Sequence, residues 1–213
     1  MNTSRFSFLL LLILNVHLHA ANDSLFNPGL MIGVDVSGFA RNYLSPETMA
    51  WEVSADKEWR RNWFAAVEAG GLSINILKES HTYKAGGYFV RMGINYNLID
   101  RSDMENVGMV YGLTRYGYGR INHEAPDITI GNHYWGNTQT AIPSERAHAH
   151  WFEMGGGLKA RLIGNVFIGW TIRTRFLIYL SETSGMEPYT ISGFGKNQGR
   201  PSVMVHYHIY YRF

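Results

Sequence analysis

Hydrophobic and polar residues alternate with a period of two along most of the chain after Leu30. Strict alternation is typical of a strand with one buried face, whereas an amphipathic helix repeats its apolar residues every three or four positions. Long helical patterns are absent from this part of the sequence. Eight alternating runs predict eight strands, at residues 30–37, 51–55, 63–70, 88–98, 107–116, 152–162, 166–178 and 202–213.

The segments between these runs differ in length in a regular way. They are short at residues 56–62, 99–106 and 163–165, intermediate at 39–48 and 77–86, and long at 119–147 and 181–201. With eight strands, short turns fall at one end and long loops at the other, as in bacterial outer-membrane barrels. We therefore predict an all-β fold, an antiparallel up-and-down transmembrane β-barrel of eight strands, with ten strands as the alternative.

One face of nearly every run is apolar, and in the fifth run this face holds Val107, Met109, Tyr111 and Leu113. The opposite faces mix small residues with charges, and we expect these charges to form a network in the barrel lumen. The network comprises Asp35, Glu52, Glu68, Arg91, Glu153, Lys159, Arg161, Arg173, Arg175 and Arg212. Alternation alone fits either a membrane barrel with its apolar face toward lipid or a soluble lipocalin-like carrier with that face inward.

Three features favour the membrane barrel. The polar faces are rich in glycine, which suits a narrow lumen that side chains must fill. Aromatic residues lie near strand ends on the apolar faces, where a bilayer has its interfaces; these are Trp51, Trp63, Tyr88, Tyr96 and Tyr207. The last run ends with Tyr207, Ile209, Tyr211 and Phe213 at alternate positions, which resembles the C-terminal signal read by the barrel assembly machinery.

The first residues read as a targeting segment. Arg5 precedes an apolar stretch from Phe6 to Val16, and Ala20 offers a small residue for cleavage. This pattern is that of a secretory signal peptide. We expect a signal peptide at residues 1–20, a short periplasmic segment at 21–29, a barrel at 30–213 and a location in the bacterial outer membrane.

The composition of the chain excludes several classes of partner and site. Only 17% of the 213 residues are charged, the net charge is +2, and there are 23 glycines and no cysteine. A near-neutral chain without a basic cluster gives no reason to expect nucleic acid as a partner. The lack of cysteine excludes disulfides, thiolate metal sites, a cysteine nucleophile and a lipid-modified N-terminal cysteine.

Several stretches resemble a known family. They are IGVDVSG at residues 32–38, YFVRMGINYNL at 88–98, YGLTRYGYG at 111–119 and the terminal run. The chain resembles a family of small Gram-negative outer-membrane barrels classed as a domain of unknown function. It is more loosely similar to OmpA-type transmembrane barrels and to accessory barrels of secretion machinery. The resemblance implies the barrel and its location and brings no catalytic residues or cofactor.

Two groups of polar residues could carry chemistry in the lumen or at its ends. The charged network fits a structural plug of salt bridges, with a narrow channel for small anions as the alternative. Each of the pairs His148–His150 and His206–His208 places two rings on one face of a strand. Two rings can serve a metal, but neither pair has a visible third ligand, so we predict no metal site and no cofactor.

A third group lies at the outer start of the sixth run, where Ser144 and Glu145 precede His148 and His150. It raises the alternative of a lipid-A-modifying enzyme, which needs a nucleophile, base and orienting group in contact. The long loops carry aromatic residues, above all Tyr134 and Trp135, with Tyr189 and Phe194 in the second loop. These suit recognition of a protein or glycan, or packing over the barrel mouth.

The leading hypothesis is therefore a structural or accessory binding barrel without catalytic activity. Its expected partners are outer-membrane lipid, the assembly machinery, and a protein or glycan at the outer loops.

Overall fold

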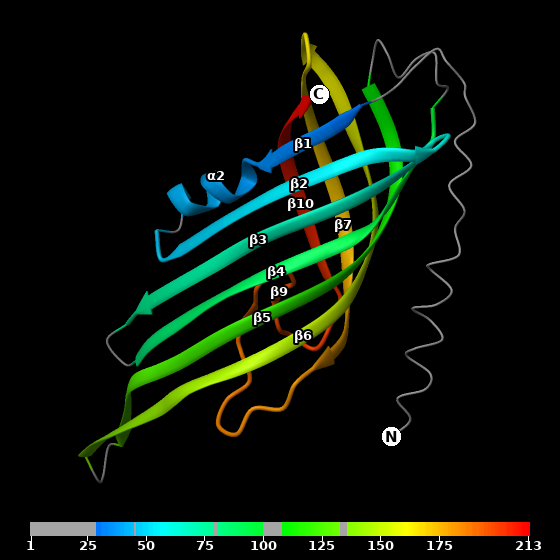
Figure 1. The fold of residues 1–213 in the computed structure, drawn as a ribbon. Coiled ribbons are helices and arrows are strands. Elements are labelled where there is room, and N and C mark those ends of the chain that lie inside the picture. The colour runs from blue at the N-terminus through cyan, green and yellow to red at the C-terminus, as the bar shows by residue number, and fades with distance from the viewer. Residues whose placement is uncertain (1–28, 45, 79–80, 100–107, 133–135) are drawn as a thin grey trace, which may run out of the picture.

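The computed structural model describes residues 29–44, 46–78, 81–99, 108–132 and 136–213. Eight antiparallel strands close into a barrel in the order β1-β10-β7-β6-β5-β4-β3-β2 (Figure 1). The strands of the barrel are β1 (Leu30–Asp35), β2 (Thr48–Arg60), β3 (Trp63–Leu77), β4 (His81–Asn97), β5 (Gly108–Asn132), β6 (Gly136–Ile163), β7 (Val166–Leu180) and β10 (Ser202–Arg212). Neighbours in the chain are neighbours in the barrel, so the predicted eight-stranded up-and-down topology is confirmed.

Two further strands do not enter the barrel. The strands β8 (Thr190–Ile191) and β9 (Gly195–Lys196) pair with each other in the loop between β7 and β10. Helix α2 (Ser37–Leu44) lies in the connection from β1 to β2, where the sequence predicts no element. Among the described residues, no helix is long and apolar enough to cross a membrane. The expected signal peptide and residues 21–28 lie outside the described residues.

The two ends of the barrel differ. The last strand ends beside the start of the first, so Phe213 and Leu30 share one end with the tight β2–β3 and β6–β7 turns. Positive φ angles at Asn62 (65°) and Gly164 (53°) allow those turns to be tight. We call this the inner end. The connections with α2 and with β8 and β9 lie at the opposite, outer end.

The wall of the barrel is uneven in height (Figure 1). Strands β5 and β6 have 25 and 28 residues, whereas β1 has 6 and β10 has 11. The segment 119–147, expected as a long loop, is instead mostly a tall hairpin of β5 and β6. That expectation was wrong because this part of the hairpin has few apolar residues on either face, so it lacks the alternation that marks a strand with one buried face.

The outside of the barrel is apolar and its inside is charged. In β10, for example, Val205, Tyr207 and Ile209 are exposed while His206 and His208 between them are buried. The terminal residues Tyr211 and Phe213 continue the outward face, with their ring centroids 4.8 Å apart. This polarity is the reverse of that of a soluble barrel, whose core is apolar.

One strand faces the opposite way from the prediction. Met109, Tyr111 and Leu113 of β5 were expected on the outer apolar face, but they are buried in the lumen against Phe64. The inner end of the lumen is packed with apolar side chains rather than charges, so an apolar face there does not identify the outside. Alternation alone could not distinguish the two faces of this strand.

Glycines make room for the largest buried side chain of the lumen, Trp151. A Cβ atom on Gly117, which lies opposite Trp151 in the neighbouring strand, would be 2.2 Å from the indole ring. The ring is held in place because its Nε1 donates a hydrogen bond of 2.7 Å to Glu153 Oε1. Around Trp151 the lumen is therefore filled to the point where one methyl group does not fit.

We expect Gly117→Ala to destabilise the barrel by about 1–3 kcal/mol, the usual cost of overpacking a tight core. The matched control is Gly112→Ala in the same strand, where a Cβ atom would meet nothing within 4 Å. Urea unfolding of both variants in lipid vesicles measures the difference. Equal stabilities would show that Trp151 can move aside.

Candidate functional site

The middle of the lumen holds ten buried charged side chains. Five are acids and five are bases, so among the described residues the charge of this cluster sums to zero with histidines neutral. We call this set the lumenal charge cluster, and it comprises Asp35, Glu52, Asp56, Glu68, Glu153, Arg91, Arg115, Lys159, Arg173 and Arg175. Burial of so many charges is tolerated only when they are paired and hydrogen-bonded.

Arg91 of β4 lies at the centre of the cluster. Its guanidinium forms ion pairs with Glu52 of β2, with Glu68 of β3 at 3.1 Å and with Glu153 of β6 at 3.3 Å. The Arg91 side chain is fully buried. One planar group thus joins carboxylates from both sides of the lumen, a role for which the fork of arginine is better suited than lysine.

Two further arginines share the same carboxylates. Arg173 of β7 donates to Glu68 at 2.6 and 2.9 Å, and Arg115 of β5 donates to Glu68 at 3.3 Å. Two of the ion pairs join direct cross-strand neighbours, because Glu68 lies opposite Arg91 and Glu153 lies opposite Arg175, at 3.0 Å. The cluster therefore depends on the register of several adjacent strands at once.

A second layer lies closer to the inner end. Lys159 forms an ion pair of 2.5 Å with Asp56, and its ammonium lies 4.2 Å from the centre of the Tyr210 ring. The pair is buried beside the rings of Tyr111 and Tyr210. Below it, the apolar residues around Phe64 fill the inner end of the lumen.

The structure brings together eight of the ten residues expected in a lumenal network. The two exceptions are Arg161 and Arg212, which lie at the inner end of the barrel. Arg161 is exposed and donates to the carbonyl oxygen of Gly164 in the β6–β7 turn at 2.8 Å. Arg212 is half-buried with its guanidinium over the Phe167 ring at 5.2 Å. Both expectations were wrong because these residues end their strands, beyond the charged layer.

Sequence reasoning missed two members of the cluster. Asp56 was read as part of a turn, although β2 continues to Arg60. Arg115 was missed because its strand was assigned the wrong face. A signal was present, since Arg115 continues the face of Tyr111 and Leu113, and an arginine does not suit a lipid-facing position.

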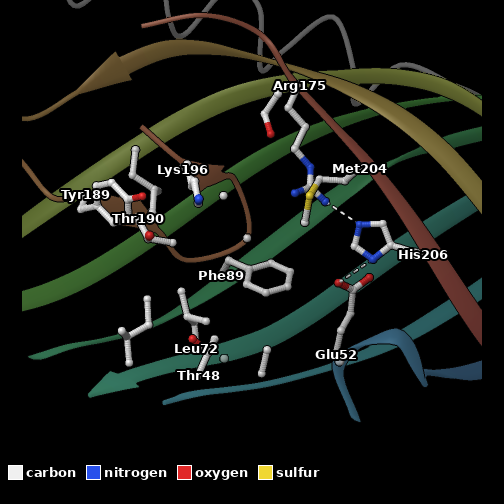
Figure 2. A pocket seen from close by; sticks show the side chains of 18 of the residues that line it. Thr48, Glu52, Leu72, Phe89, Arg175, Tyr189, Thr190, Lys196, Met204 and His206 are labelled. Carbon is white, nitrogen blue, oxygen red and sulfur yellow. Dashed lines mark hydrogen bonds and ion pairs between the residues drawn. The ribbon is translucent and has the colours of Figure 1, made fainter. Parts of the chain in front are cut away.

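His206 connects the cluster to the outer half of the lumen. Its Nδ1 lies 3.0 Å from Asp35 Oδ2. On the other side of the ring, Arg175 Nη2 lies 2.7 Å from Nε2 (Figure 2). Because arginine only donates, Nε2 accepts and Nδ1 carries the proton that is donated to Asp35. The ring is then neutral and fixed in one tautomer.

This arrangement bears on metal binding. Ligand atoms of Asp35, Glu52 and His206 lie within 4.8 Å of one another, and His208 Nε2 is 3.5 Å from Glu52 Oε1. A metal on His206 Nδ1 would require a proton on Nε2, which would then face the Arg175 donor. The donor set therefore fits a hydrogen-bonded relay better than a metal site.

A cavity of about 790 Å³ lies above the cluster at the outer end. Its floor includes Glu52, Arg175 and His206, and Phe89 projects into its centre (Figure 2). The loop between β7 and β10 forms part of its wall, and Ile191 and Phe194 of this loop pack into the lumen against Phe89, Ala149 and Trp151. Arg175 Nη1 fixes this loop by donating to the carbonyl oxygen of Phe194 at 3.0 Å.

The aromatic residues of the long loops lie in different environments. Phe194 is 1% exposed and packs over the barrel mouth, while Tyr189 is exposed beside the cavity. Tyr134 and Trp135, the strongest candidates for loop contacts, lie outside the described residues. The recognition role expected for them stays a prediction.

The residues considered for an enzyme do not meet. The Nδ1 atoms of His148 and His150 bond to the hydroxyls of Tyr118 and Tyr116, each at 2.7 Å, on the outer surface of the wall. The contacts described for these two rings are with tyrosines and not with Ser144 or Glu145. This geometry does not assemble a nucleophile and its base.

One family covers nearly the whole sequence. Residues 2–213 match the family described as Domain of unknown function (DUF6048). The chain belongs to the DUF6048 family. No curated protein matches the chain.

Solved structures similar to this DUF6048 protein are distant. Ail, the attachment invasion locus protein of Yersinia pestis, is 13% identical with a TM-score of 0.44, covering 87% of this chain and 97% of Ail. Neisserial surface protein A (NspA) is 10% identical with a TM-score of 0.41, covering 89% of this chain and 100% of NspA.

The lumenal charge cluster gives a stability test. We expect Arg91→Met to cost about 3–5 kcal/mol, because it leaves three buried carboxylates without their central partner. Arg146→Met, an exposed change of the same kind, is the control and should stay within about 0.5 kcal/mol of the parent. Urea unfolding in vesicles measures both, and a neutral Arg91→Met would mean that the carboxylates find other partners.

Proposed function

We propose that this protein is an integral outer-membrane barrel with a sealed lumen that acts by binding at its outer end. The observation that carries the proposal is the polarity of the wall, with ten charges buried inside and apolar side chains exposed outside. In water such a surface would be unstable, whereas in lipid it is the required one.

Closure of the sheet supports a membrane location. Backbone groups in hydrocarbon have no water partner, so only a helix or a closed barrel satisfies them. All eight strands of the barrel pair on both sides over part of their length. A soluble lipocalin-like carrier would need an apolar lumen, and the lumenal charge cluster occupies that place instead.

Aromatic residues mark two levels on the outside. Trp63 and Tyr96 lie directly opposite each other near the inner end, with ring centroids 4.8 Å apart. Trp51 and Tyr88 both lie opposite Gly71, at a second level eight residues further along β3. Eight residues span about 26 Å along the strand. At a tilt of about 40° this is a rise of roughly 20 Å, most of an apolar band about 25 Å tall.

The packing of the lumen supports the proposal that the barrel does not conduct ions. Charges of both signs are paired across its width, and aromatic side chains fill the space above and below them. An anion channel needs an excess of unpaired positive charge along an open path. The open space lies at the outer end, which favours binding there over transport.

We expect the protein to be recovered in the outer-membrane fraction and to migrate differently on gels before and after boiling. The shift reports a closed barrel that resists detergent until heated. Recovery in the soluble periplasm without a shift would contradict the membrane location and make a soluble carrier the better reading.

We also expect no steady conductance in planar bilayers after reconstitution, because the cluster blocks the lumen. A general porin reconstituted in parallel serves as the positive control. Reproducible single-channel steps with anion selectivity would overturn the sealed-lumen proposal in favour of a narrow channel.

A further inference from the structure

The wall of the barrel is incomplete at one seam in its outer half. Strand β1 pairs with β2 only up to Val34 and with β10 only up to Asp35, after which Val36 donates one last bond to the carbonyl of Tyr207. Beyond that point, residues 202–206 of β10 pair with β7 alone among the described strands. Residues 48–52 of β2 likewise pair with β3 alone.

Helix α2 lies mainly against the β2 edge of this seam and only touches β10. The side chain of Asn42 accepts a hydrogen bond of 2.9 Å from the Ala50 backbone nitrogen, and its amide contacts the Ala50 carbonyl oxygen at 3.4 Å. The Asn42 side chain thus makes the hydrogen bonds to Ala50 of β2 that a neighbouring strand would otherwise make. This cap satisfies the β2 edge without bringing it to β10, so the seam need not close.

The outer cavity passes through the wall at this seam. Its lining includes lumenal residues on each side, Glu52 of β2 and Met204 of β10. It also includes their outward-facing neighbours, Trp51 and Val203, which are 51% and 60% exposed. A cavity bounded by both faces of the wall opens sideways, toward the medium that surrounds the barrel.

The lining is amphipathic. Apolar lining comes from Leu72, Phe89 and Met204, and the loop between β7 and β10 adds Lys196 (Figure 2). Ile74 and Arg200 also line the cavity. On the floor, Asp35 and Glu52 are held by His206 and Arg91. The volume of about 790 Å³ lies in the range of small-molecule sites.

We infer that an acyl chain of a phosphate-bearing membrane lipid enters the outer cavity sideways, through the seam between β2 and β10. This inference rests on the proposed membrane location. The occupant is a membrane lipid because the seam opens between exposed side chains, Trp51 and Val203, at the outer aromatic level, where the chains and headgroups of the bilayer meet. The cations of the lining suit the phosphate of its headgroup, while the apolar lining suits the chain.

Photocrosslinking tests the inference on the whole mature protein. The probe is a phosphatidylglycerol with a diazirine near the end of one acyl chain, present in trace amounts in phosphatidylethanolamine–phosphatidylglycerol vesicles. After irradiation, mass spectrometry locates the adducts. We expect adducts on outward-facing Val203 and Val205, and also on lumenal Leu72, Phe89 and Met204.

Two variants make the test specific. Met204→Trp fills the lumenal side of the seam and should reduce the adducts on Leu72 and Phe89 roughly tenfold, equivalent to about 1.4 kcal/mol of binding. It should leave the adducts on Val203 and Val205 unchanged. The control is Val205→Trp in the same strand, which should keep the lumenal adducts because it adds the same ring on the outer face.

The outcomes separate the two proposals. Outward adducts without lumenal ones in the unaltered protein would overturn the lipid site and leave the membrane barrel standing. Loss of both kinds of adduct would overturn the membrane location itself. Lumenal labelling by a water-soluble photoactivatable fatty acid, but not by the phospholipid, would contradict sideways entry. If Met204→Trp gives no gel shift on boiling, that variant has not formed a closed barrel. The adducts of the unaltered protein then decide alone whether lipid enters the cavity.

Discussion

Charge pairing in the lumen is the constraint on which the rest of this barrel depends. Glu68 and Glu153 are satisfied only when arginines from β4, β5 and β7 arrive at the same height. A slip of one residue in any of these strands would turn its arginine to the outside and leave a carboxylate buried without a partner. The cluster therefore selects the register of the strands, in addition to filling the space between them. An apolar lumen would tolerate such a slip more easily, because apolar contacts are not directional.

The sequence was sufficient to predict the strand count, the topology and most of the charge cluster, because period-two alternation is strong wherever one face meets charges. It failed where both faces carry similar residues. At the inner end of β5 the lumenal face is itself apolar, so Met109, Tyr111 and Leu113 were assigned to the outside and Arg115 was lost with them. In the outer hairpin few apolar residues mark a buried face, and strands were read as loop. Both failures have one cause, since alternation reports a difference between two environments rather than the strand itself.

The outer cavity could not be predicted from the sequence for a different reason. Its lining comes from β1, β2, β3, β4, β7, β10 and the loop between β7 and β10, and no two of its key residues form a motif. His206 and His208 did stand out as a pair, but Asp35, Glu52 and Arg175 reach His206 only through closure of the barrel. Closure also decides the chemistry, because the Arg175 donor on Nε2 turns a plausible metal ligand into a fixed hydrogen-bond relay.

The closed lower part of the lumen and the open seam above it both follow from the short length of β1. β1 is long enough to close the barrel around the charge cluster at its lower levels, where water or ions could otherwise pass. It ends at Asp35, level with the top of the cluster, and the chain then leaves the wall as α2. Above that level the lumen is bounded below by paired charges and on one side by a seam. We therefore propose that a ligand in this space leaves outward or sideways and does not pass through, as in a binding site open to the membrane rather than a pore.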